Sequence, residues 1–283
     1  MNRTIAIIGP GRMGAGLGLA LHRSGHRVAL LGRHRRMGPA GMGDVLAVEA
    51  WDEVLDGAPV VLVAVPDDAI TPVARQLAAG GRIGSSHIVL HLSGLLDRGA
   101  LAPLEPTRAA LGSMHPLIAI PDSAAAPDRF PGAWTAVEGD ARAIVCGESL
   151  ATAVGMQPFR LPAGAKAAYH AAAAMASNFS VAVFDAALRI AADAGIEADV
   201  ARRIYAPLLR GTADNLAAAA PADALTGAIR RGDADTVAAH LGAITDPTLR
   251  EAYVTLAELT VRLAERAGLP PDAAGRVREV LAR

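Results

Sequence analysis

Three glycines near the start of the sequence have the spacing of a loop that binds phosphate groups. Gly9, Gly11 and Gly14 follow a β-branched run at residues 4–8 and open an apolar stretch at residues 13–24. Such glycines allow a tight turn, close approach of the backbone to a pyrophosphate, and close contact between helix and strand. Free N–H groups of the helix start would face the phosphates. The motif predicts a dinucleotide site, although a tight turn alone would need the same kind of residue. We expect Arg12 and Met13 to contribute to that site.

The end of the next predicted strand indicates which dinucleotide would bind. An NAD site usually carries Asp or Glu there for the ribose 2′-hydroxyl, whereas a 2′-phosphate favours arginine. Residues 31–36 read Leu-Gly-Arg-His-Arg-Arg and contain no acid. We therefore expect Gly32, Arg33 and Arg36 to line an NADP site. NAD stays open, because Arg33 could stack on the adenine of either cofactor.

Two more strand ends predict the remainder of the cofactor site. The apolar runs at residues 60–65 and 87–92 should end at the carboxyl edge of a sheet, where open α/β sheets bind ligands. Asp67 could instead cap the next helix. His91 could point into the sheet rather than toward the ligand. The residues expected to line the site from these two strand ends are Val65, Pro66, Asp67, Ser93 and Gly94.

A second group of polar residues lies in an alanine-rich stretch. His170, Ala173 and Ser177 follow Lys166 by 4, 7 and 11 residues, which places all four on one stripe of a helix. Asn178 would lie beside that stripe. A buried ammonium or imidazole costs free energy unless it faces a cavity or a partner. Lys166, His170, Ser177 and Asn178 are therefore candidate catalytic residues. The alternative is that Lys166 reaches solvent, His170 is a satisfied core histidine and Asn178 bonds the backbone.

Strand-like and helical runs alternate through the first half of the chain. This pattern predicts an α/β fold with a parallel sheet covered on both faces, as in a Rossmann dinucleotide-binding domain. The expected strands are residues 4–8, 27–31, 60–65, 87–92, 109–114, 133–137 and 157–161, and the expected helices are 13–24, 67–79 and 140–154.

From Gly164 onward the pattern is helical only. The expected helices are residues 165–194, 198–219, 222–231, 234–241 and 247–267. A Pro/Gly break at residues 162–164 suggests a Rossmann domain at 1–162 and an all-helical substrate or dimerisation domain at 163–283. Alanine-rich helices can approach one another closely. We therefore expect a homodimer through the helical domain, although the sequence does not exclude a monomer.

Composition narrows the class of ligand. The chain has 283 residues, a net charge of −1 and a single cysteine, with no Cys/His spacing typical of zinc. We therefore expect no nucleic-acid or membrane partner, no disulfide and no metal, but a small-molecule substrate. The apolar run at residues 5–8 is too short for a secretion signal, which favours the cytoplasm. Residues 167–184 contain no Asp, Glu, Lys or Arg but include polar side chains such as His170 and Asn178, so we expect a buried helix there.

Three segments resemble an uncharacterised family that joins a Rossmann-like domain to a helical domain of unassigned function. They are residues 112–117, which include His115, and residues 166–179 and 225–233. That family is similar to the ketopantoate reductases, pyrroline-5-carboxylate reductases and β-hydroxyacid dehydrogenases. The resemblance implies a Rossmann domain followed by a helical, often dimerising, domain. It also implies a catalytic lysine at Lys166, while His170 stands where ketopantoate reductases and β-hydroxyacid dehydrogenases have asparagine.

These observations lead to the hypothesis of an NADPH-dependent oxidoreductase that reduces a small oxo acid. Lys166 would act as general acid, His170 would orient the substrate or relay the proton, and His115 would line the substrate side. Ser177 and Asn178 would donate hydrogen bonds. One alternative is an imine reductase of the pyrroline-5-carboxylate type. Another is a non-catalytic NADP-binding sensor whose helical half binds a partner.

Overall fold

The structure is a computed structural model that describes residues 4–35, 37–39, 42–43, 45–46, 51–120 and 126–283. The chain forms two compact units, Met1–Ala176 and Ser177–Arg283. An N-terminal α/β unit is followed by a helical one, as the sequence predicted.

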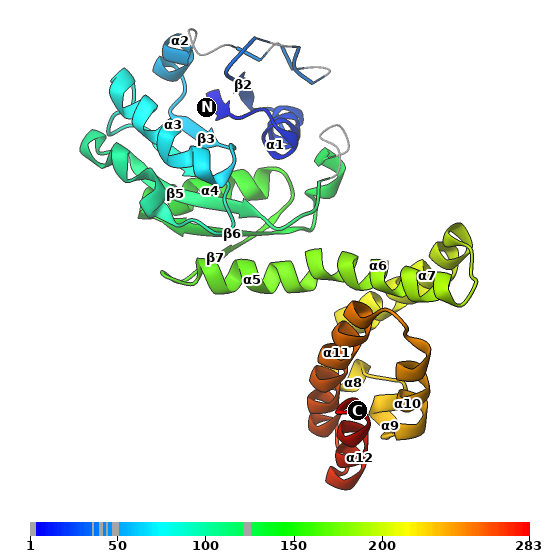
Figure 1. Cartoon of the computed structure of the whole chain (residues 1–283). Helices are drawn as coiled ribbons and strands as arrows, with labels where there is room; N and C mark the ends of the chain where they lie inside the picture. Colours follow the sequence, from blue (N-terminus) through cyan, green and yellow to red (C-terminus); the bar gives the residue numbers. More distant parts are fainter. Residues whose placement is uncertain (1–3, 36, 40–41, 44, 47–50, 121–125) are drawn as a thin grey trace. The chain divides into compact units, whose positions relative to one another are not determined.

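The first unit is built on a seven-stranded sheet in the order β2-β1-β3-β4-β5-β6-β7 (Figure 1). Strands β1 to β5 pair in parallel, as expected, but β6 is antiparallel to β5 and parallel to β7. The expectation of an entirely parallel sheet is therefore wrong at β6. A parallel pair needs a crossover, usually a helix. In the described part of the β5–β6 connection the only helix is one short 3₁₀ turn, η3 (Ala126–Arg129). The strands are β1 (Thr4–Ile8), β2 (Arg27–Leu31), β3 (Val60–Val63), β4 (Ile88–His91), β5 (Ala110–Pro116), β6 (Trp134–Gly139) and β7 (Gln157–Arg160).

Alternate residues of the strands build two cores, one on each face of this sheet. Ile5 and Ile7 belong to the core that includes α1 (Arg12–Arg23) and α4 (Ala141–Ala153). Ala6 and Ile8 belong to the core on the opposite face. Both faces are thus covered, as a buried parallel sheet requires. The elements of the second core are α2 (Trp51–Asp56), α3 (Asp67–Gly80) and the 3₁₀ helix η2 (Arg98–Thr107).

Helix α5 (Lys166–Ala176) completes the first unit. The change to an all-helical pattern comes at the expected residues 162–164, whereas the division into compact units comes one helix later. The reason is that Lys166 and Tyr169 of α5 bond to groups at the end of the sheet. The single helix expected at residues 165–194 is interrupted at Ser177, which precedes α6 (Asn178–Asp193).

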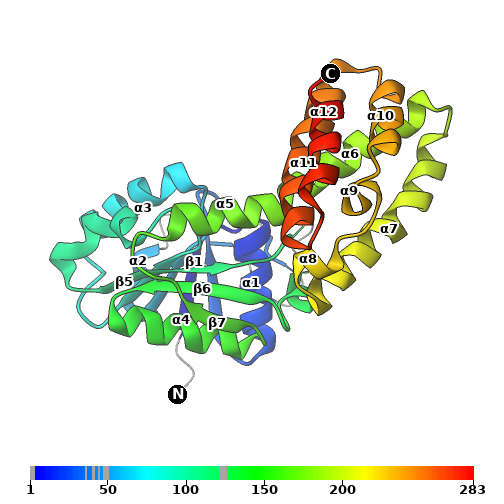
Figure 2. The ribbon, with the colours of Figure 1, turned by 90° about the horizontal axis from the view of Figure 1, so that it is seen from below.

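The second unit is helical throughout its length. Helices α10, α11 and α12 lie side by side (Figures 1 and 2) and share a core that includes Val237, Leu241, Val261 and Val277. Helix α12 was not expected, and the helix expected at residues 222–231 is divided by a turn at Gly227 into α8 and α9. The helices after α6 are α7 (Ala198–Ala218), α8 (Pro221–Ala224), α9 (Ala228–Arg231), α10 (Ala234–Ala243), α11 (Pro247–Arg266) and α12 (Pro271–Leu281).

The apolar segment that spans α5 and α6 is exposed. Lys166–Asp193 has 28 residues, its most apolar window has a mean hydropathy of 1.4, and none of that window is buried. The expectation of a buried helix at residues 167–184 is therefore wrong. Neither the part of the segment in the first unit nor the part in the second is buried by its own unit. Length and composition would allow this segment to cross a membrane, but core helices of soluble proteins pass the same test. The exposure shows that this surface has no cover within its own unit.

One glycine at the end of β6, opposite Gly112 of β5, should be irreplaceable. Gly139 has φ +125°, and a Cβ there would overlap Gly112 Cα and the Leu111 carbonyl oxygen. Gly139→Ala should lower the free energy of unfolding by about 2 kcal/mol or more, because backbone strain and overlap add. Urea denaturation measures this change. The matched control is Gly80→Ala at the end of α3, where the new Cβ makes only an ordinary contact, 3.6 Å from Asp52. Equal losses in the two variants would contradict the prediction.

Candidate active site

The glycine loop packs against the end of β3. Gly9 has φ +99°, and a Cβ there would come within 2.6 Å of the Ala64 carbonyl oxygen. A Cβ at Gly14 would overlap the Gly9 carbonyl oxygen, so helix α1 starts in direct contact with the turn. Gly11 is exposed, and a Cβ there would have no neighbouring atom within 4 Å. The first and third glycines therefore serve packing, while the second leaves open space for a ligand.

A cavity of about 780 Å³ opens beside this loop. Its walls come from the loop, the end of β2, the end of β3 and the start of α3, which together form the carboxyl edge of the sheet. Gly32 must be small here, because a Cβ would lie 2.9 Å from Val45 Cγ1. Among the described residues that line the cavity, Arg33 carries a positive charge and none carries a carboxylate. The volume and the charge fit an anionic dinucleotide.

The other residues expected at the cofactor site are distributed around this edge. Val65 and Pro66 line the cavity, and Asp67 begins α3 immediately after them. Arg12 and Met13 form the first turn of α1. Arg36 lies outside the described residues.

Lys166 is the central polar group at the same edge. Its side chain is only 4% exposed, and Nζ donates a hydrogen bond of 2.7 Å to the carbonyl oxygen of Ser93, just after β4. Because β4 lies beside β3 in a parallel sheet, this loop and the glycine loop follow strands that end at one edge. The buried ammonium therefore lies at the edge of the sheet where open α/β sheets bind ligands.

Two histidines lie on either side of Gly94. A Cβ at Gly94 would lie 2.5 Å from Nδ1 of His170 and 2.8 Å from Nε2 of His115. The two rings are 5.9 Å apart between centroids, at an angle of 76°. Nδ1 of His115 also lies 2.9 Å from the hydroxyl of Tyr169. The structure thus brings Ser93, Gly94 and His115 together with three residues of α5, namely Lys166, Tyr169 and His170.

His91 has a structural role at the end of β4. It is fully buried; the main-chain N–H of Ser93 donates to its Nδ1, and its Nε2 lies 3.0 Å from the Asp97 carbonyl oxygen. Nδ1 is therefore the acceptor and Nε2 carries the proton. Burial lowers the pKa of His91 to about 4, so the ring stays neutral. This ring fixes the main chain that holds Lys166.

Burial also sets the ionisation of Lys166 and His115. It lowers the pKa of Lys166 to about 8, against the opposing charges of Glu138, Asp67 and Asp97. The pKa of His115 falls to about 4, first because of burial and then because of the Lys166 charge. At neutral pH the site therefore contains a lysine ammonium that can release its proton and a histidine that is neutral.

Ser177 and Asn178, the other two candidate catalytic residues, lie in the second unit. Ser177 precedes α6 and Asn178 begins it, and both are exposed. The stripe expected to run from Lys166 to Ser177 is interrupted, because the helix breaks between Ala176 and Asn178. No group of three or more metal-ligating side chains occurs in the part of the chain that the structure describes.

Two features of the sequence point to this site but were not used in the analysis of residue spacing. Tyr169 lies three residues after Lys166, so it falls on the same side of α5 and reaches His115. Lys166 is also the only lysine among the 27 lysines and arginines of the chain. Because lysine occurs only once in the chain, its single position could have been recognised from the sequence as unusual.

Two family models match the chain, one in its N-terminal α/β part and one mainly in its helical part. Residues 2–116 match a family described as a Rossmann-like domain, and residues 133–260 match a family described as a domain of unknown function (DUF2520). The chain joins a Rossmann-like domain to a DUF2520 domain. This pairing is the one that the three sequence segments indicated. No curated protein matches the sequence.

Several solved structures share this fold across nearly the whole chain. A candidate NADP oxidoreductase of Bacteroides fragilis has a TM-score of 0.69 at 18% identity, covering 92% of this chain and 98% of its own. A pyrroline carboxylate reductase of Plasmodium falciparum with NADP bound has a TM-score of 0.62 at 11% identity, covering 99% and 98%. A reductive aminase of Aspergillus terreus in complex with NADPH has a TM-score of 0.60 at 16% identity, covering 100% and 93%. At these identities the likeness establishes the fold.

Because Lys166 is the only lysine, its titration can be observed directly. Protein labelled with ¹³C-lysine should give one Cε signal whose titration midpoint lies near pH 8, because burial disfavours the ammonium. The same sample unfolded in urea should titrate near the ordinary lysine pKa of about 10.4. A folded midpoint equal to the unfolded one would show that the ammonium is not desolvated.

Proposed function

We propose that this protein is an NADPH-dependent reductase of a small oxo acid. The observation that carries the proposal is the buried ammonium of Lys166, at the same sheet edge as the glycine loop and its cavity. Reduction of a carbonyl needs a hydride donor on one side and a proton donor on the other. The first unit has a cavity whose size and charge suit a hydride-donating dinucleotide, and it has Lys166 as a candidate proton donor.

The proton would come from Nζ of Lys166. NADPH, when bound, supplies the hydride for the carbonyl carbon. One N–H of the ammonium donates to the Ser93 carbonyl oxygen, which leaves two for the oxygen of the substrate. As negative charge develops on that oxygen, the ammonium stabilises it and transfers a proton, giving a hydroxy acid. A pKa of about 8 suits this transfer near neutral pH.

Arg33 supports NADP over NAD. It is exposed at the end of β2 and lines the cavity, where no described carboxylate would repel a 2′-phosphate. Its guanidinium can bond two phosphate oxygens at once. The likeness to structures with NADP or NADPH bound agrees with this choice.

The second candidate is an imine reductase. Two of the similar structures are a pyrroline carboxylate reductase and a reductive aminase, names that point to C=N reduction. A protonated imine already carries the proton that a carbonyl must acquire. Such a reaction would depend less on Lys166, which separates the two candidates experimentally.

Lys166→Met is the variant that tests the reductase. NADPH and NADH titration should show tighter binding of NADPH, and NADPH oxidation should then be followed with 2-oxo acids, β-oxo acids and cyclic imines. With an oxo acid, the variant should lose about 10²- to 10⁴-fold in kcat, the usual contribution of a general acid. NADPH affinity should stay nearly unchanged, because Lys166 bonds the Ser93 carbonyl rather than the cavity wall.

Other outcomes separate the rival functions. Full turnover of a cyclic imine by the Lys166→Met variant would favour the imine reductase. Binding of NADPH without turnover of any compound would favour a sensor. Failure to bind either dinucleotide would overturn the assignment of the glycine loop.

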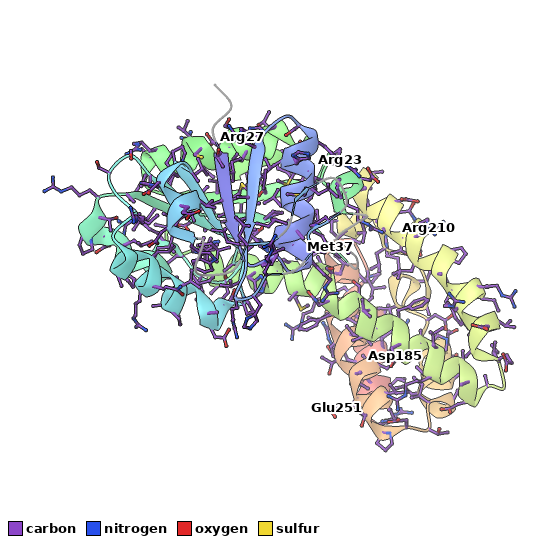
Figure 3. The ribbon with its side chains drawn as sticks, turned by 90° about the horizontal axis from the view of Figure 1, so that it is seen from above. Arg23, Arg27, Met37, Asp185, Arg210 and Glu251 are labelled. Atoms are coloured by element: carbon purple, nitrogen blue, oxygen red, sulfur yellow. The ribbon has the colours of Figure 1, made fainter. Side chains whose placement is uncertain are left out.

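We also propose that helices α6 and α7 pair with a second copy of the chain. Of the residues described in these helices, only Ala191 and Ala201 are buried. Phe179, Val181 and Leu208 are more than half exposed. Helices in proteins owe most of their stability to a packed apolar face, so this pair needs a cover. Asp185 of α6 and Arg210 of α7 (Figure 3) have opposite charges, which allows ion pairs between two copies related by a two-fold axis.

Val181→Glu tests this interface. The wild-type protein should sediment as a dimer, and Val181→Glu should shift it toward monomer, because two carboxylates would be buried per dimer. The matched control is Val145→Glu on α4, since Val145 is 61% exposed and Val181 71%. A monomeric wild-type protein, or wild-type protein that sediments with lipid vesicles, would contradict the proposal.

A further inference from the structure

The hydroxyl of Tyr169 and the ring of His115 form a defined pair in the first unit. Tyr169 lies on α5 and His115 near the end of β5, with 2.9 Å between the hydroxyl and Nδ1. The rings are 5.6 Å apart between centroids and nearly perpendicular, at 86°. Phe159 of β7 packs against the tyrosine ring, with centroids 5.9 Å apart. The phenol is therefore held by contacts on two sides.

The direction of this hydrogen bond follows from its partners. Burial raises the pKa of Tyr169 to about 12, so the phenol keeps its proton. Among the described residues, Nδ1 of His115 is the only hydrogen-bond partner of that hydroxyl. If Nδ1 were the donor, the half-buried phenol proton would be left without an acceptor, which costs free energy. The hydroxyl therefore donates to Nδ1.

The single proton of the neutral ring must then lie on Nε2. A neutral imidazole has one donor nitrogen and one acceptor nitrogen. Nε2 lies beside Gly94, where a Cβ would be only 2.8 Å away. Among the described residues, Nε2 has no hydrogen-bond partner, so its N–H is available to an acceptor atom of a ligand. The rings of His115 and His170 can both approach this point of the main chain because Gly94 has no side chain.

We propose that Tyr169 is a positioning residue that fixes His115 as the Nε2–H tautomer, so that His115 offers a neutral N–H donor to an oxygen of the substrate. This donor would favour substrates that place a carbonyl or carboxylate oxygen beside Gly94. The tautomer follows from the contacts and burial of His115 within the first unit, whereas its use by a substrate rests on the proposed function. A neutral donor holds such an oxygen without adding a second cation beside the Lys166 ammonium.

Nitrogen NMR of ¹⁵N-histidine-labelled protein tests the tautomer at neutral pH. In the wild-type protein, Nε2 of His115 should have the shift of a protonated nitrogen and Nδ1 that of an acceptor. In Tyr169→Phe this preference should be lost, with both nitrogens moving toward the average of two exchanging tautomers. A wild-type ring protonated on Nδ1, or a tautomer unchanged in the folded Tyr169→Phe variant, would overturn the proposal.

The second unit supplies a matched control. Nδ1 of His240 lies 2.9 Å from the hydroxyl of Tyr253, with ring centroids 6.0 Å apart at 82°, but His240 is exposed. Tyr253→Phe should change the nitrogen shifts of His240 only. It should leave the His115 shifts and any turnover as in the wild type. A change at His115 in this variant would show that the measured shifts do not report the Tyr169 contact.

Kinetics tests the use of this donor by substrate. Tyr169→Phe should raise KM for an oxo acid about tenfold, the effect of losing one net hydrogen bond, with a smaller change in kcat. A Tyr169→Phe enzyme with unchanged KM would refute the substrate contact even if the tautomer is as proposed. Absence of turnover in the wild-type protein would refute the proposed function and leave the NMR result to decide the tautomer.

Discussion

The hydrogen bond between the Lys166 ammonium and the Ser93 carbonyl is the contact on which the rest of the site depends. A buried ammonium is costly unless its donors are satisfied, so its acceptor must be firmly held. The Ser93 N–H donates to His91, and the Ser93 hydroxyl accepts from the N–H groups of Leu95 and Leu96. Every polar group of this residue is therefore in use. The contact ties α5 to the end of β4 and places the ammonium at the edge where the glycine loop also lies.

The same burial decides where the positive charge of the site is placed. His91, His115 and Lys166 are close enough that the charge of Lys166 lowers the pKa of both histidines. Burial contributes more than this charge, and together they keep both rings neutral at neutral pH. Lysine starts from a far higher pKa and keeps its charge until about pH 8. The arrangement thus leaves one ammonium near two neutral rings.

Much of the fold could be predicted from the sequence, because short apolar strands and glycine turns are local signals. The first four strands and the glycine loop lie where the pattern placed them. The direction of β6 depends on its connection to β5, which periodicity does not report. The break at Ser177 was missed because neither Gly nor Pro marks it. The exposure of α6 could not be predicted either. An apolar helix has the same composition whether its apolar face packs against its own chain or against another molecule.

Spacing within one element could indicate which residues lie together, whereas contacts between two elements could not be predicted. Lys166 and His170 lie four apart on α5, but the contact of Tyr169 with His115 joins residues 54 positions apart. Gly94 was predicted from its place after a strand, and the reason it must be glycine, the two rings beside it, required the structure.

The choice of lysine rather than arginine at position 166 has a physical reason. The other 26 of the 27 lysine and arginine positions in this chain are all arginine. Arginine keeps its proton at any pH that the folded protein meets, and its planar group needs several acceptors. In the proposed reaction the buried group releases a proton, and in the structure it has one carbonyl oxygen to bond, so of these two residue types only lysine fits. The single lysine of the sequence therefore stands at the position for which we propose a compact ammonium that exchanges its proton.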